Sequence, residues 1–314
     1  YESDEVLSLD RVPQSLLVVG GGVIGCEYAS MFAALGIRVV LVDRKDRLIG
    51  FMDREISEAL RIDMVEQGVE VIFGDEVREV DNAPDPMRVR LQSGKMMEFE
   101  AILVCAGRRA SVQGLGLDRL GIQLGEKELI PVNDQYQTSV PNIYAAGDVI
   151  GFPALASTSR EQARIAMVHA FDIQERLNLT RILPYGIYTV PECSMAGATE
   201  EDLTKKGTPF VVGKAMYWHN ARGLIIGDRN GFLKLIFHAE DLKLLGVHVI
   251  GEQATELVHV GLTAIMIGAG ADLFLNTCFN HPTLSGLYKD ATFDALNRLK
   301  AAKAGWSGPV STLT

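Results

Sequence analysis

Residues 14–25 read QSLLVVGGGVIG, a run of apolar residues that leads directly into a cluster of glycines. The apolar part, residues 14–20, is short and almost continuously hydrophobic, which is typical of a β-strand that is buried on both faces. Beyond the glycines, apolar residues recur at helical spacing as far as Leu35, and Gly36 provides an end for the helix. The stretch therefore predicts a strand, a tight turn and a helix in direct succession.

Two further strands, with a helix between them, follow in the same order. Residues 37–42 (IRVVLV) and 69–73 (VEVIF) predict buried strands, and Asp53 is placed to cap a helix over residues 54–67. A β-α-β-α-β order of this kind is half of a doubly wound parallel sheet. The sequence therefore predicts the α/β class, with a doubly wound, Rossmann-like domain at its start.

The glycine cluster has the spacing of a dinucleotide-binding turn, G-x-G-x-x-G, between a strand and a helix. Gly20 permits the tight turn, Gly22 lets backbone N–H groups reach a pyrophosphate, and Gly25 lets the helix and strand pack closely. The helix N-terminus brings a partial positive charge toward the anion. Asp43 ends the second strand and can accept hydrogen bonds from ribose hydroxyls. The predicted nucleotide-binding residues are Gly20, Gly22, Val23, Ile24, Gly25 and Asp43.

The residues around Asp43 leave the choice between NAD and NADP open. Asp43 favours NAD, but Arg44, Lys45 and Arg47 follow at once, and a guanidinium there could pair with a 2′-phosphate. These three basic residues could equally form a solvated loop. Glu27, in the first turn of the helix, is either part of the cofactor site or a surface acid favoured by the helix dipole.

The rest of the chain predicts two more domains. A hairpin or meander at 87–91 and 96–99, a strand at 101–106, a strand at 142–147 and a helix at 158–177 come first. After Pro184, the pattern changes to an antiparallel sheet covered by helices, which is an α+β arrangement. Its strands are expected at 210–217, 223–227, 231–238 and 242–250, and its helices at 252–268 and 283–300. We place the domains at 1–112, 113–180 and 181–314.

Several segments resemble the pyridine nucleotide–disulfide oxidoreductase family, and the resemblance covers essentially the whole chain. They include TSVPNIYAAGD at 138–148, GIYTVPECSMAGATEEDL at 186–203 and LLGVHVIGEQATELVHVG at 244–261. The resemblance implies an NAD(P)-binding domain, the second segment of an FAD-binding domain and a C-terminal domain that forms a homodimer. The apolar stretch 255–268 would then lie in the dimer interface, although periodicity alone fits the core as well.

The same resemblance assigns residues to the flavin site. Gly107, with Arg108 after it, matches the hinge between the NAD and FAD domains. Asp148 matches the aspartate that hydrogen-bonds the ribityl chain of FAD, and a backbone group near Ala156 matches one that meets the flavin ring. Family members begin with an FAD-binding half that has its own glycine fingerprint, and residues 1–3 resemble the linker that follows that half. We therefore expect the chain to lack it.

Asn280-His281-Pro282-Thr283 resembles the family's His-Pro-Thr motif. In the disulfide reductases of the family this histidine is the acid/base for a thiol, and a glutamate five residues later orients it. The corresponding position here is Gly286, so His281 is a catalytic candidate without its partner. The broken pair puts thiol chemistry in doubt.

The resemblance implies hydride transfer between NAD(H) and NADP(H) through FAD, a reaction that needs no thiol acid. One alternative is a disulfide reductase of the dihydrolipoamide dehydrogenase type, which requires a cysteine pair upstream. Another is a non-catalytic nucleotide-binding and dimerisation fragment, which would bind NAD(H) without stoichiometric FAD.

Composition narrows the remaining possibilities. Among 314 residues, 30 Lys and Arg against 40 Asp and Glu give a net charge of −10, which lacks the basic footprint of nucleic-acid binding. No apolar run reaches the length of a membrane span. The four cysteines are widely scattered, and no histidine pairs with another ligand at helical spacing, so we predict no metal site. The cysteine pattern favours a reducing, cytoplasmic location.

Overall fold

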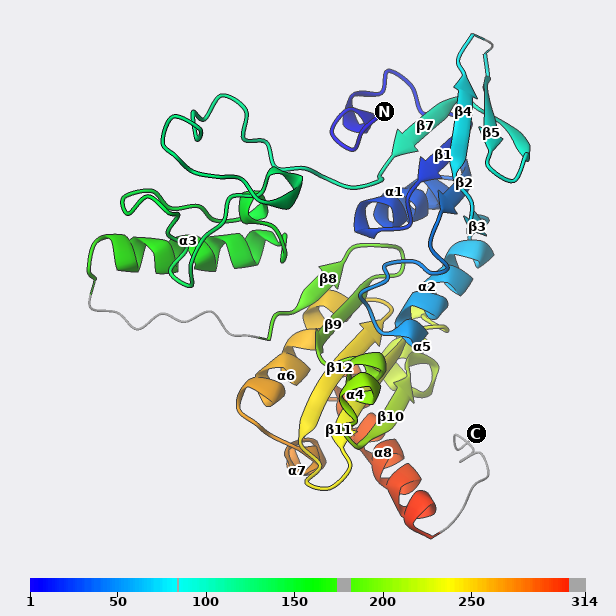
Figure 1. The fold of residues 1–314 in the computed structure, drawn as a ribbon. Helices are drawn as coiled ribbons and strands as arrows, with labels where there is room; N and C mark the ends of the chain where they lie inside the picture. The colour runs from blue at the N-terminus through cyan, green and yellow to red at the C-terminus, as the bar shows by residue number, and fades with distance from the viewer. Residues whose placement is uncertain (84, 174–181, 305–314) are drawn as a thin grey trace. The chain divides into compact units, whose positions relative to one another are not determined.

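The computed structural model describes residues 1–83, 85–173 and 182–304, and they fall into two compact units (Figure 1). The first unit comprises Tyr1–Ala106 together with the chain from Pro184 onward, and the second comprises Gly107–Leu183. The first unit holds three sheets and the second is built around one long helix. The domain boundaries expected from the sequence stay a prediction.

A four-stranded parallel sheet forms the start of the first unit. Its order is β3 (Glu70–Phe73), β2 (Arg38–Asp43), β1 (Ser15–Val19) and β7 (Ala101–Val104). Strand β1 is central, pairing with β2 from Ser15 opposite Arg38 and with β7 from Leu16 opposite Ala101. The predicted α/β class and doubly wound start are therefore confirmed, with boundaries that differ by one or two residues from those expected.

The two faces of this sheet are covered differently. Helices α1 (Val23–Ala34) and α2 (Arg54–Glu66) pack on one face, and an antiparallel meander of β4 (Val77–Asp81), β5 (Met87–Leu91) and β6 (Met96–Phe99) packs on the other. Alternate residues of a strand belong to the hydrophobic core under the helices and to the one under the meander, because side chains on a strand point to opposite faces. In β1, Leu16 and Val18 face the helices while Leu17 faces the meander.

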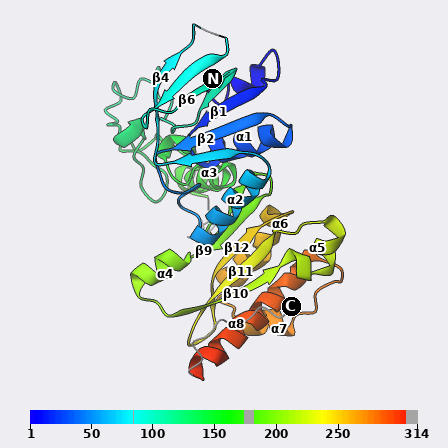
Figure 2. The same ribbon diagram turned by 90° about the vertical axis from the view of Figure 1, so that its right-hand side faces the viewer.

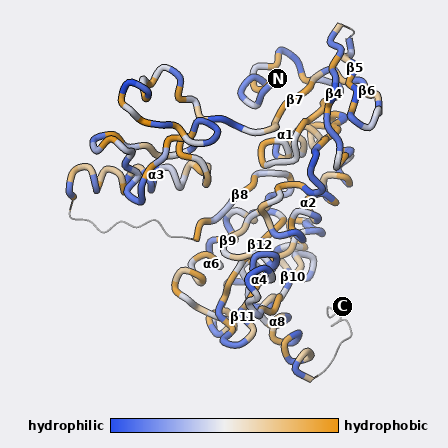
Figure 3. The backbone as a smooth tube through the Cα atoms, in the orientation of Figure 1, coloured by the Kyte–Doolittle hydropathy of each residue, from blue (hydrophilic) through white to orange (hydrophobic). Residues whose placement is uncertain are grey.

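The later part of the first unit is a five-stranded antiparallel sheet in the order β10-β11-β12-β9-β8. Its strands are β8 (Tyr185–Ile187), β9 (Cys193–Gly197), β10 (Phe210–Met216), β11 (Phe232–His238) and β12 (Leu244–Ile250). Its helices are α4 (Glu200–Lys206), α5 (Ala221–Ile226), α6 (Ala254–Met266), α7 (Ala271–Asn276) and α8 (Leu287–Lys303). The predicted α+β arrangement is present, and Figure 3 shows that α4 is hydrophilic.

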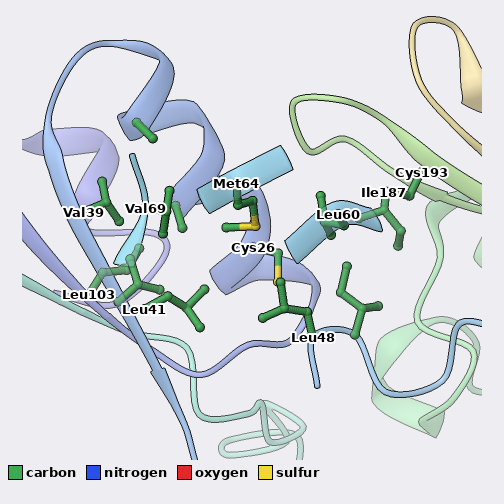
Figure 4. Packing of buried hydrophobic residues seen from close by; sticks show 14 of the residues in the cluster. Cys26, Val39, Leu41, Leu48, Leu60, Met64, Val69, Leu103, Ile187 and Cys193 are labelled. Carbon is green, nitrogen blue, oxygen red and sulfur yellow. The ribbon is translucent and has the colours of Figure 1, made fainter. Parts of the chain in front are cut away.

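One hydrophobic core joins the parallel sheet and the five-stranded antiparallel sheet of this unit across α2. Cys26 on α1 and Leu60 on α2 belong to the same buried cluster as Ile187 and Cys193, which come from β8 and β9 (Figure 4). Figure 2 shows α2 between the parallel sheet and the antiparallel one. The half that contains the parallel sheet is thereby held against the C-terminal half by apolar packing.

The strand expected at 223–227 is wrong, because the structure has helix α5 there. The side chain of Asn220 accepts hydrogen bonds from the backbone N–H groups of Arg222 and Gly223, which caps the helix at its start. Gly227 ends it in a left-handed conformation with φ 78°. The composition of the short apolar run Leu224–Ile226 is typical of a strand. A helix forms there because Asn220 caps its start and Gly227 ends it.

Removing this cap has a predictable effect on stability. We expect Asn220→Ala to lower the free energy of unfolding by about 1–2 kcal/mol, since two backbone N–H groups lose their acceptor. Urea denaturation followed by circular dichroism measures the change, with Asn142→Ala, an exposed asparagine of the second unit, as the control. Equal midpoints for the Asn220 variant and the unaltered protein would contradict the prediction.

The second unit has a small core and a long helix, α3 (Ala156–Ala170). The strand expected at 142–147 is wrong: among the described residues of this unit, Tyr144 forms only an isolated bridge with Gln137, and no neighbouring strand is present. The helix expected at 158–177 begins earlier and ends at Ala170, followed by Asp172 with φ 47°. Residues 174–177 lie outside the described residues.

Candidate nucleotide-binding site

Two glycines of the turn between β1 and α1 are required by close backbone approaches. Gly20 has φ 113°, and a Cβ there would lie 2.6 Å from the carbonyl oxygen of Cys105, just beyond β7. A Cβ on Gly25 would lie 1.9 Å from the carbonyl oxygen of Gly20. No side-chain movement relieves either overlap, because both obstacles are backbone atoms. These two positions therefore fix how tightly α1 follows β1.

Gly22 differs from its neighbours because none of the described residues occupies the space where a side chain at this position would lie. It is the N-cap of α1, with φ −76° and no side-chain cap, and a Cβ there would meet no atom within 4 Å. The first-turn N–H groups of a helix have no acceptor within the helix, and they carry the positive end of its dipole. The start of α1 is therefore an open cradle for an anion, at Gly22, Val23 and Ile24.

Asp43 links the end of β2 to the glycine turn. One carboxylate oxygen accepts the backbone N–H of Gly21 at 2.5 Å, and the other accepts the N–H of Lys45 at 2.8 Å. Each carboxylate oxygen can accept more than one hydrogen bond, so Asp43 keeps capacity for a ribose hydroxyl. The structure thus places Asp43 beside the glycine turn and gives it a second, structural role that the sequence did not predict.

A pocket of about 740 Å³ extends from Gly22 along the connection between β2 and α2. Arg44, Lys45 and Arg47 line it. Arg44 is 80% exposed, with its Nε 3.6 Å from Glu76, whereas Arg47 forms a 2.9 Å ion pair with Glu201 on α4. The basic residues expected near the ribose therefore lie along one pocket.

Glu27 makes a contact to the C-terminal half. Its carboxylate accepts the backbone N–H of Tyr188 at 2.9 Å, and nearby Ser30 accepts the N–H of Val190 at 3.1 Å. Helix α1 is therefore tied to the segment that follows β8. This contact gives Glu27 a packing role alongside the cofactor role expected of it.

The flavin-site candidates of the second unit lie around the start of α3. Gly107, at the start of the unit, has φ 135°, which favours glycine. Asp148 is exposed at the start of a short 3₁₀ helix, directly after Gly147, whose N–H donates to Gln162 of α3 at 2.7 Å. Ala156 is exposed at the first position of α3, and no side chain caps that helix. The structure therefore brings the Asp148 segment against α3, whose N-terminus is uncapped.

The structure places His281 on the surface ahead of α8. It precedes a 3₁₀ turn at Leu284–Gly286, and α8 begins at Leu287. Pro282 and Thr283 line a pocket with Arg222 and Gln253. The pocket beside Pro282 and Thr283 shares no lining residue with the pocket that begins at Gly22.

Sequence reasoning missed a buried ion cluster between the two halves of the first unit. Lys234 of β11 is fully buried, with its ammonium 2.7 Å from Asp53 and 3.1 Å from Glu55, and it also pairs with Glu200 of α4. Burial alone would lower the pKa of Lys234, but these carboxylates raise it. The available signal was a lysine in the middle of the apolar strand FLKLIFH, which demands buried partners.

Comparison with known proteins identifies the chain's relatives. The profile of the pyridine nucleotide-disulphide oxidoreductase family matches residues 1–163, and that of the family's dimerisation domain matches residues 183–292. The chain belongs to the pyridine nucleotide-disulphide oxidoreductase family. The resemblance expected from the sequence is therefore confirmed.

Relatives within this family are close over nearly all of the chain. The soluble pyridine nucleotide transhydrogenase of Mycobacterium bovis is 45% identical over 300 residues, covering 96% of this chain and 64% of the relative. The protein of the same name from Yersinia enterocolitica is 41% identical over 303 residues, covering 95% of this chain and 65% of the relative. The chain thus spans slightly less than two thirds of the length of these curated relatives.

Solved structures of the family agree with the fold. The crystal structure of LpdA from Mycobacterium tuberculosis superposes with a TM-score of 0.86 at 28% identity, covering 93% of this chain and 64% of that one. The HOCl-induced flavoprotein disulfide reductase RclA of Escherichia coli gives a TM-score of 0.88 at 25% identity, covering 93% and 67%. The family fold therefore extends over both units. Among the described residues, no helix is both long and apolar enough to cross a membrane.

Proposed function

We propose that this chain is the NAD(P)-binding and dimerisation part of an FAD-dependent enzyme that transfers hydride between NAD(H) and NADP(H). The observation that carries the proposal is the open cradle at Gly22, which has free space, uncapped helix N–H groups and a basic pocket beside it. A pyrophosphate suits the helix N-terminus, and ribose hydroxyls suit the carboxylate of Asp43. The names of the curated relatives support the same reaction.

The residues of the second unit fit part of an FAD site. Exposed Asp148 offers a hydrogen-bond acceptor for a ribityl hydroxyl, and the uncapped start of α3 at Ala156 offers backbone N–H donors. A flavin held by these residues would supply the hydride acceptor and donor that links one nicotinamide to another. The contribution of this chain is to hold the dinucleotide at Gly22 and Asp43 and to present Asp148 and Ala156 to the flavin. We place the hinge at Gly107.

This reaction needs no thiol acid, which agrees with Gly286 standing where a disulfide reductase of the family has its glutamate. The alternative is a disulfide reductase of the dihydrolipoamide dehydrogenase type, with His281 as its acid/base. The four cysteines of this chain are free and lie far apart in the sequence, without the closely spaced pair that this alternative needs, so it requires a cysteine pair outside these 314 residues. Sequencing the gene upstream of Tyr1 distinguishes the two reactions.

We also propose that the protein is a cytoplasmic homodimer. The match to the family's dimerisation domain supports self-association through the C-terminal half. Four free thiols favour a reducing compartment. Light scattering of the purified protein measures the oligomeric state directly.

Calorimetry of NADH binding tests the nucleotide site. We expect Asp43→Ala to weaken NADH binding by about 1–3 kcal/mol, because hydrogen bonds from the ribose to a carboxylate are lost. Asp10→Ala, at an exposed aspartate of the same unit, should leave the affinity unchanged.

Asp43 also holds Gly21 and Lys45, so the measurement must separate ribose contacts from loop geometry. NADH that lacks the adenosine 2′-hydroxyl makes this separation. If Asp43 accepts that hydroxyl, the deoxy analogue binds the unaltered protein more weakly, and Asp43→Ala weakens it less than it weakens NADH. Equal affinity of NADH for the Asp43 variant and the unaltered protein would show that Asp43 does not contact the ribose.

A further inference from the structure

The ion pair between Arg47 and Glu201 connects the nucleotide pocket to the C-terminal half. Arg47 lines the pocket that begins at Gly22. One of its guanidinium nitrogens lies 2.9 Å from Glu201, and another donates to the carbonyl oxygen of Gly50. Both side chains are about two-thirds buried, at 30% and 32% exposed, so water screens the pair less than it would on an open surface. The guanidinium of Arg47 therefore already has two acceptors within the protein, a carboxylate and a backbone carbonyl.

Glu201 is held firmly in this position by its surroundings. It belongs to the first turn of α4, which Thr199 caps with a reciprocal capping box. The neighbouring Glu200 donates its backbone N–H to Asp53 and pairs with the buried Lys234. The start of α4 thus contacts the connection between β2 and α2 at two points, Arg47 and Asp53.

We propose that Glu201 is a positioning residue that restrains Arg47 and thereby sets the preference between NADP(H) and NAD(H). A 2′-phosphate entering the pocket would compete with Glu201 for the guanidinium of Arg47 and would meet the repulsion of a nearby carboxylate. NAD(H) carries no phosphate at that position, so Glu201 disfavours NADP(H) selectively. The inference rests on the proposed nucleotide site, and it adds to that site a residue from α4 that restrains its phosphate-binding arginine.

Binding of two fragments tests the inference without any flavin. Adenosine 2′,5′-bisphosphate carries the 2′-phosphate and AMP lacks it. The affinity for the bisphosphate divided by the affinity for AMP therefore reports how strongly that phosphate is bound. We expect Glu201→Gln to raise this ratio by about five- to tenfold at low salt. The gain should shrink at high salt, because it is electrostatic. Isothermal titration calorimetry on the 314-residue protein gives both affinities.

A double-mutant cycle separates this role from a structural one. In an Arg47→Gln background, Glu201→Gln should raise the ratio much less, because the competition for Arg47 is gone and only the direct repulsion between the carboxylate and the phosphate remains. Glu240→Gln, at an exposed glutamate in the turn between β11 and β12, makes the same charge change and should have no effect. An unchanged or lowered ratio in Glu201→Gln, or the same gain without Arg47, would overturn the inference. Failure of the unaltered protein to bind AMP and NADH would instead overturn the proposed function.

Discussion

Replacing Lys234 with methionine is expected to lower the free energy of unfolding by about 3–5 kcal/mol at neutral pH. The ammonium is fully buried and lies among Asp53, Glu55 and Glu200, and the structure describes its pairing with all three carboxylates. Methionine fills a similar volume but removes the cation that the three carboxylates share, and among the described residues only Glu55 keeps another lysine partner, Lys214. Removal of one partner from a buried ion cluster is costly because the remaining charges stay desolvated. Urea denaturation followed by circular dichroism measures the loss.

The pH dependence of this loss distinguishes charge from packing. Burial would raise the pKa of Asp53, but the neighbouring His248 and Lys234 lower it below its ordinary value. The pKa of Glu55 is lowered as well, because Lys214 and Lys234 outweigh its burial. A carboxyl group with a lowered folded-state pKa contributes stability above its unfolded pKa, near pH 4, and loses it as the pH falls further.

In Lys234→Met, Asp53 loses this lysine and Glu55 keeps only Lys214, so the pKa values of both carboxyl groups should rise and they should protonate more readily. The stability difference between the two proteins should therefore be large at pH 7 and should shrink as the pH approaches 4. Lys95→Met removes an exposed ion pair with Glu70 and should cost about 1 kcal/mol or less. A deficit of the same size at pH 7 and pH 4 would mean that Lys234 acts through packing alone.

The local pattern of the sequence was sufficient to predict the parallel sheet. It was not sufficient to predict the contacts between the two halves of the first unit. The glycine turn and the apolar strand before it are local features, and their spacing carries the β-α-β order. The strand expected at 142–147 failed because a strand needs a neighbour, and periodicity does not show whether one exists. Leu224–Ile226 became a helix because Asn220 and Gly227 cap it, and those signals outweighed an ambiguous apolar run.

In the candidate site, too, the local features were predictable from the sequence and the contacts between distant residues were not. The cradle at Gly22 follows from the local strand–turn–helix pattern. Glu201 lies 154 residues from Arg47 in the sequence, and Lys234 lies 181 residues from Asp53. No spacing rule links such pairs, because packing of one half of the unit on the other brings them together. An isolated lysine in an apolar strand signals that a partner exists, but not which residue it is.

Alanine at Gly25 is expected to destabilise the protein strongly, whereas alanine at Gly22 should leave its stability nearly unchanged. Gly25→Ala should lower the free energy of unfolding by about 3 kcal/mol, because its Cβ would lie 1.9 Å from a backbone oxygen of Gly20 and would push α1 away from β1. Gly22→Ala should change stability by about 1 kcal/mol or less, since its backbone conformation is ordinary and its Cβ would meet no atom within 4 Å.

For Gly22→Ala, the effect is expected on nucleotide binding and not on stability. The space in front of Gly22 is where a pyrophosphate would approach the N–H groups at the start of α1, so a methyl group there should weaken NADH binding by about tenfold or more while the protein stays folded. Gly125→Ala is a matched control, because Gly125 also has an ordinary φ and its Cβ would make only van der Waals contacts, the nearest at 3.7 Å, but it lies in the second unit. Thermal denaturation and NADH calorimetry on the three variants give both quantities. Tight NADH binding by a folded Gly22→Ala protein would place the dinucleotide elsewhere, because a pyrophosphate held at the start of α1 cannot share that space with a side chain.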